Sequence, residues 1–85
     1  MKSYIKYEQD GEIITKDMDG CTLDQVLYLA SNMYAFDDCT GIEVKEIVHE
    51  GKRYEYDGWE AGMVFSFRDD TGEIVWQQDF PGWDH

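Results

Sequence analysis

Only one segment of the chain, residues 23–36, has helical periodicity, and patterns typical of β-strands flank it on both sides. Thr22 is the predicted N-cap, and Gln25 three residues later completes a capping box. The apolar residues that recur on one helical face are Leu23, Val26, Leu27, Ala30, Met33 and Tyr34. A lone amphipathic helix has to bury its apolar face, and strands are its only available partner. We therefore expect an α+β fold with the helix packed on one face of a sheet.

The segment before the helix predicts a β-hairpin. Residues 4–8 and 12–16 are rich in strand-forming side chains, and Asp10-Gly11 between them is a typical hairpin turn. Asp37 and Asp38 follow the helix, where its dipole favours cations. Either this acid pair has a separate use, or the helix stops earlier and both residues lie in a loop.

After residue 42 the sequence predicts a four-stranded antiparallel meander. The expected strands are 42–49, 52–57, 63–68 and 73–80, and short turns separate most of them. The alternation in the first strand breaks at Glu46-Ile47-Val48, which indicates a β-bulge or a strand whose outer face is buried. The predicted core residues of the meander are Phe65, Phe67, Ile74 and Trp76.

The length of the chain leaves room for one hydrophobic core, so residues 1–85 are expected to form one domain. A composition that is 42% hydrophobic and 15% aromatic favours a folded chain over an acidic disordered tail. The predicted fold class is thus a single small α+β domain, made of an N-terminal β-hairpin, one α-helix and a C-terminal four-stranded antiparallel meander.

The charge of the chain is strongly negative, with 19 acidic against 7 basic side chains and a net charge of -12. This charge disfavours direct binding to nucleic acid or to anionic membranes. The net charge is confined to two blocks: residues 17–41 hold five acids and no base, and residues 54–85 hold eight acids and one base. One interpretation is that this charge only keeps the domain soluble; the other is that it meets a partner.

No residue pattern indicates catalysis, a cofactor or a bound metal. None of the serines lies in a nucleophile elbow, and no glycine-rich phosphate loop is present. Asp17-Met18-Asp19-Gly20 resembles half of a calcium loop, but Thr15 and Val26 stand where that loop needs acidic ligands. We therefore expect a protein that is not an enzyme.

The two cysteines indicate a cytoplasmic protein. Cys21 and Cys39 flank a predicted helix about 21 Å long, whereas a disulfide needs Cα atoms within about 7 Å. Two free thiols, together with an N-terminus that lacks the apolar stretch of a secretory signal, favour a reducing compartment. No apolar run reaches the roughly 20 residues of a membrane helix.

Residues 54–85 combine the larger acidic block with eight of the thirteen aromatic side chains. Aromatic anchors inside a rim of acids suit a basic protein partner. Trp59 and Trp83 are either such exposed anchors or lids that fold back on the core. The predicted partner-binding residues are Asp37, Asp38, Glu55, Asp57, Trp59, Glu60, Asp69, Asp70 and Trp83.

In size, charge and fold style the chain resembles the nucleic-acid-mimic inhibitors of phage and mobile elements, such as anti-CRISPR and antirestriction proteins. The resemblance implies a DNA- or RNA-binding protein as partner, met by rows of carboxylates such as Glu55 and Asp57. The alternative is an accessory domain whose acidity serves solubility and which forms a homodimer through a strand edge or through its aromatic tail.

Overall fold

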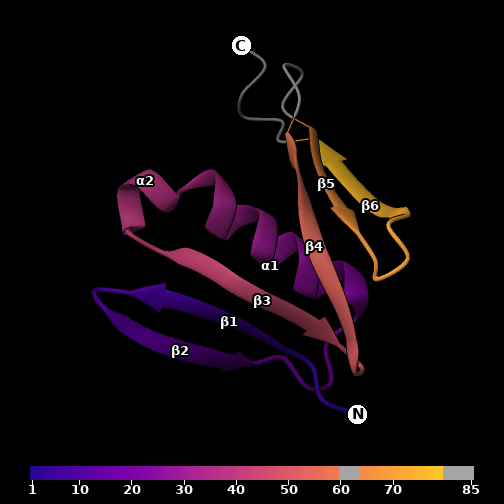
Figure 1. The fold of residues 1–85 in the computed structure, drawn as a ribbon, viewed down its shortest axis with the longest axis horizontal. Helices are drawn as coiled ribbons and strands as arrows, with labels where there is room; N and C mark the ends of the chain where they lie inside the picture. Colours follow the sequence, from indigo (N-terminus) through magenta and orange to yellow (C-terminus); the bar gives the residue numbers. More distant parts are fainter. Residues whose placement is uncertain (60–63, 80–85) are drawn as a thin grey trace.

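The computed structural model describes residues 1–59 and 64–79, with backbone alone at positions 37, 38, 58, 59, 64 and 79. Its elements in chain order are β1 (Tyr4–Gln9), β2 (Glu12–Asp17), α1 (Leu23–Ala35), α2 (Asp37–Thr40), β3 (Glu43–His49), β4 (Lys52–Trp59), β5 (Val64–Arg68) and β6 (Ile74–Asp79). The six strands form one antiparallel sheet in the order β2-β1-β3-β4-β5-β6. The predicted α+β class, with a hairpin, a helix and then a meander, is confirmed (Figure 1).

Two tight turns set the register of the sheet. Asp10 and Gly11, between β1 and β2, both have positive φ, at 55° and 82°. Glu50 and Gly51 repeat this conformation between β3 and β4, at 49° and 80°. Two consecutive residues with positive φ match the right-handed twist of the flanking strands, so each turn joins its two strands in register.

The predicted capping box of α1 is confirmed. The Thr22 side chain accepts a hydrogen bond from the Gln25 amide at 3.1 Å, and the Gln25 side chain accepts one from the Thr22 amide at 2.8 Å. The helix ends at Ala35 with Phe36 as its C-cap. Asp37 and Asp38 follow this C-cap directly and begin the short helix α2, so the expected loop is absent at these two positions.

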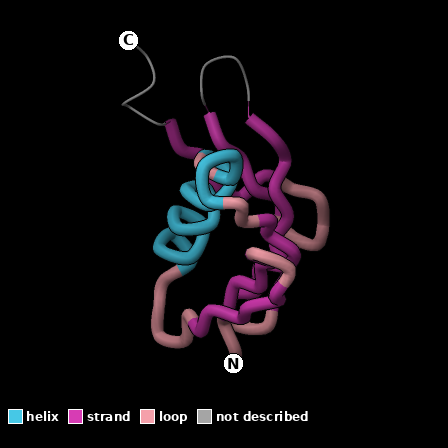
Figure 2. Tube along the Cα trace, turned by 90° about the vertical axis from the view of Figure 1, so that its left-hand side faces the viewer, coloured by secondary structure: helices cyan, strands magenta, loops and turns pink. Residues whose placement is uncertain are grey.

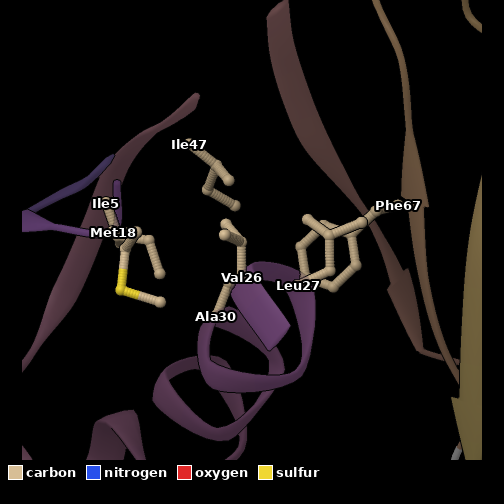
Figure 3. Packing of buried hydrophobic residues seen from close by; sticks show 7 residues of the cluster. All are labelled: Ile5, Met18, Val26, Leu27, Ala30, Ile47 and Phe67. Atoms are coloured by element: carbon tan, nitrogen blue, oxygen red, sulfur yellow. The ribbon is translucent and has the colours of Figure 1, made fainter. Parts of the chain in front are cut away.

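The core lies between α1 and the sheet, which the helices cover on one face (Figure 2). Figure 3 shows α1 presenting its apolar face to β1 and β3 on one side and to β5 on the other. The buried cluster consists of Ile5, Met18, Val26, Leu27, Ala30, Ile47 and Phe67. Because Leu27 and Phe67 meet on one side and Ile5 and Ile47 on the other, α1 joins both halves of the sheet.

A β-bulge explains the broken alternation of β3. Lys6 pairs with Glu46 and Tyr7 with Val44, so Lys45 is an extra residue in that strand. Beyond the bulge Ile47 and Val48 are both buried, although they point to opposite faces of the sheet. The β-bulge and the buried outer face, which the sequence pattern offered as two explanations, are therefore both present.

A second bulge overturns one predicted core residue. Phe67 pairs with Trp76 and Arg68 with Ile74, so Val75 is the extra residue of β6. The bulge places Ile74 opposite Arg68 rather than on the core face, and Ile74 is 40% exposed. The prediction of Ile74 as core is thus wrong, whereas Phe65 and Phe67 are buried as predicted. Trp76 is half-buried and packs against the core.

The sheet opens between β3 and β4. These strands pair only at Ile47–Tyr54, Val48–Arg53 and His49–Lys52, next to their shared turn. Farther along, residues 43–46 continue to pair with β1, while β4 continues to pair with β5. The two strands therefore diverge as a V, and α1 crosses behind the opening (Figure 1). No helix in the described ranges has the length and apolarity needed to cross a bilayer.

Candidate protein interface

Three of the predicted partner-binding residues meet at one surface depression. Glu55 of β4 and Asp69 and Asp70 of the β5–β6 turn line an open hollow of about 440 Å³. Arg53, Thr71 and Gly72 complete the lining, so three carboxylates share the hollow with a single basic side chain. We call this surface the acidic depression.

Asp69 builds the turn that carries the depression. Its Oδ1 accepts hydrogen bonds from the Thr71 amide at 2.9 Å, the Thr71 hydroxyl at 2.5 Å and the Glu73 amide at 3.2 Å. The Thr71 hydroxyl bond, more than any other interaction, lowers the pKa of Asp69 from its ordinary value. Asp70 is exposed and has no hydrogen-bond or ion-pair partner among the described residues. Asp69 thus shapes the turn, and Asp70 presents a free charge.

Asp57 lies next to the depression but is neutralised. Its Oδ1 accepts a hydrogen bond from Arg68 Nε at 2.5 Å, and Arg68 Nη1 donates to the Gly72 carbonyl at 2.5 Å. Asp57 is also the extra residue of a bulge in β4, because Tyr56 pairs with Phe67 and Gly58 with Ser66. Glu55 and Asp57 therefore do not form a plain row of free carboxylates.

The basic residue of the depression is also engaged. Arg53 donates two hydrogen bonds to Glu46 Oε2, one of them from Nε at 2.9 Å, and the Tyr4 hydroxyl donates to Oε1 at 2.9 Å. The hydrogen bond from Arg53 is the main cause that lowers the pKa of Glu46, and the hydrogen bond from Tyr4 is the second. The hydrogen bond to Glu46 in turn raises the pKa of Arg53. Arg53 is therefore bonded to Glu46, and it acts on Glu55 only through its charge, without a hydrogen bond or ion pair. Lys52 likewise acts on Asp69 through its charge alone.

Three of the five acids of residues 17–41 form hydrogen bonds within the fold. Asp17 accepts from the Asp19 amide at 2.9 Å, and Asp19 accepts from the Ser3 amide at 2.7 Å. Asp24 accepts from the Trp76 indole at 2.8 Å. Sequence reasoning missed these roles, because the partners of Asp19 and Asp24 lie 16 and 52 residues away.

The remaining predicted residues are not brought to the depression. Asp37 and Asp38 lie in α2, on the opposite side of the molecule from the β5–β6 turn (Figure 1). Trp59 is the last residue of β4, and its side chain is not described. Glu60 and Trp83 lie outside the described residues.

The described residues contain no group of three or more histidine, cysteine or acidic side chains arranged to hold a metal ion. Cys21 and Cys39 are both free thiols. A scan against protein-family models found no match, and searches of curated proteins and of solved structures likewise returned no similar chain. The residues of this chain alone therefore have to carry any functional proposal.

Proposed function

We propose that this chain is a non-enzymatic interaction module, and that it binds a basic protein surface through the acidic depression. The observation that carries the proposal is the meeting of Glu55, Asp69 and Asp70 around a hollow whose basic residue is engaged elsewhere. Uncompensated carboxylates attract a basic surface and accelerate its approach, and screening by salt weakens that attraction.

The sharpest version of this proposal is a partner that normally binds DNA or RNA, since such proteins carry Lys and Arg side chains that neutralise phosphates. The chain would then occupy the nucleic-acid channel as an inhibitor of the mimic type, in the cytoplasm. The net charge of -12 supports this version, because it exceeds the magnitude of about 2–8 that suffices for the solubility of a small domain.

The test begins with capture of partners from a native lysate at low salt and elution by a salt gradient. The affinity of the purified partner is then measured against Glu55→Lys and Asp70→Lys. Glu12→Lys is the matched control, because Glu12 is also exposed and the substitution changes the net charge by the same amount. We expect the first two variants to weaken binding about tenfold or more and the control to have a small effect.

Equal loss in all three variants would mean that only total charge matters, which contradicts a defined interface at the depression. Binding that is insensitive to salt and to all three substitutions would contradict the electrostatic proposal altogether. Displacement of the partner's own nucleic acid by the wild-type chain is the result expected for the mimic version.

The second candidate function is that of an accessory domain that dimerises through a strand edge. It is favoured by one observation: β6 is one of the two outer strands of the sheet and carries two partly exposed aliphatic residues, Ile74 and Val75. An open apolar edge is a template for pairing with a second copy. Sedimentation at two concentrations tests this candidate. A wild-type dimer that becomes a monomer with Val75→Lys would support it. A wild-type monomer at both concentrations would reject it.

A further inference from the structure

The opening between β3 and β4 contains a second pocket, of about 280 Å³. Three tyrosines line it, Tyr34 from α1 and Tyr54 and Tyr56 from β4, together with Glu46 and Glu55. Neighbouring residues of a strand point to opposite faces of a sheet, so Tyr54 and Tyr56 do not share a face with Glu55. All three side chains line one pocket because the sheet is open between β3 and β4. We call it the tyrosine pocket.

The aromatic wall of the tyrosine pocket is held in place by packing. Tyr34 stacks on Tyr56 with ring centroids 4.0 Å apart and an interplanar angle of 18°. Phe67 supports both rings at 6.2 Å and 5.7 Å in tilted geometry. Since Phe67 is fully buried, the two stacked tyrosines rest on the core of the domain and form a preorganised surface.

One carboxylate of the tyrosine pocket, that of Glu55, makes no ion pair, although the charge of Arg53 acts on it from a distance. Lys45 also lines the pocket, but its ammonium contacts Glu43 at 2.7 Å and Glu8 at 3.7 Å. Glu46 is bound by Arg53 and Tyr4. Glu55 has no hydrogen-bond or ion-pair partner among the described residues. It lies close enough to Tyr34 to add to the effect of burial in raising the pKa of that phenol.

We propose that the tyrosine pocket binds one arginine side chain of the partner, whose guanidinium contacts the tyrosine rings and pairs with Glu55. The inference rests on the proposed function and names the anchor of that interaction. A planar guanidinium combines contact with aromatic rings and hydrogen bonding to a carboxylate better than the ammonium of lysine does.

The shared position of Glu55 links the tyrosine pocket to the acidic depression, because this residue lines both. An arginine bound by Glu55 would bring the neighbouring residues of the partner over Asp70. A partner with two basic side chains close together therefore fits this face, with one in the tyrosine pocket and the other above the β5–β6 turn.

The test is an NMR titration of the folded chain with N-acetyl-arginine amide at constant ionic strength. N-acetyl-citrulline amide is the matched probe, since it has nearly the same shape but no charge. We expect saturable shifts at Tyr34, Tyr54 and Glu55 with the arginine probe and much smaller shifts with the citrulline probe. Glu55→Gln should weaken arginine binding by roughly three- to tenfold, whereas Asp70→Asn should change it less than twofold.

Three results would overturn the inference: equal shifts with both probes, shifts confined to residues 69–72, or arginine binding that Glu55→Gln leaves unchanged. Glu55 is exposed, so Glu55→Gln is expected to fold, and the dispersion of its amide spectrum checks this. If the tyrosine pocket fails this test while Asp70→Lys still weakens the purified partner, the proposed function stands and only the arginine anchor is wrong.

Discussion

The indole Nε1 of Trp76 donates a 2.8 Å hydrogen bond to Asp24 Oδ1, which joins the outer strand β6 to the first turn of α1 across 52 residues of sequence. The carboxylate serves two purposes there: it interacts favourably with the helix dipole and accepts the indole proton. Trp76 also packs edge-on against Phe67 at 5.6 Å, so this tryptophan ties the helix, the outer strand and the core together.

Asp24→Ala should lower the free energy of unfolding by about 1 kcal/mol, because it removes an exposed hydrogen bond and a favourable dipole interaction. Urea denaturation measures this loss. Trp76→Phe keeps most of the packing and removes only the donor. The variant that carries both substitutions completes the cycle. If its loss in free energy of unfolding equals the sum of the two single losses, the two residues are not coupled and the hydrogen bond contributes nothing.

Thr22→Ala should cost about 1 kcal/mol of stability, because the amide of Gln25 loses its acceptor at the start of α1. Thr22→Ser keeps the hydroxyl and should stay within about 0.5 kcal/mol of the wild type. Thermal unfolding followed by circular dichroism compares the two. Equal loss in both variants would contradict a capping role.

Phe67→Ala should destabilise the domain by about 3–5 kcal/mol, since the ring is fully buried and contacts Tyr34, Tyr56 and Trp76. A domain of 85 residues typically has about 4–13 kcal/mol of stability, so a large unfolded fraction is expected. Ile74→Ala is the control, because that side chain faces solvent, and it should cost less than about 1 kcal/mol. A small effect of Phe67→Ala in urea denaturation would contradict the observed core.

Acid should destabilise the domain through Glu46. Its pKa in the folded state lies below the ordinary value of 4.5, so the unfolded chain binds this proton more readily. The contribution of Glu46 is therefore fully present above pH 4.5 and is lost as the pH falls through the lower folded pKa. Urea denaturation across this range should show a shallower decline for Glu46→Gln than for the wild type. If the free energies of unfolding of the two proteins fall in parallel with pH, Glu46 is not a source of the acid sensitivity.

Local sequence patterns predicted most of the fold. The capping box of Thr22 and Gln25, the Asp10-Gly11 turn and the order of the strands all depend on residues close together in sequence. The bulge at Val75 escaped prediction, because an extra residue leaves no mark until the partner strand is known. The short helix α2 was missed for a similar reason, since four residues are too few to show a helical period.

The candidate interface was less predictable than the fold. Counting charges identified the acidic segment but not which acids stay free. The cross-strand pairs Asp57–Arg68 and Glu46–Arg53 decide which acids stay free, and they depend on the register of neighbouring strands. The tyrosine pocket was not predicted either, because it requires β3 and β4 to separate after three pairs.

That separation has a consequence for the energetics of docking. Outer strands normally carry the only backbone edges a sheet offers to another chain, whereas here β3 and β4 part in the middle of the sheet. A segment that enters between them displaces no existing β3–β4 ladder, so local melting of the sheet is not part of its cost. Each half of the sheet keeps its own three strands while α1 holds the two together, and the hydrogen bonds from Arg53 to Glu46 are side-chain links between β3 and β4 at the start of the opening.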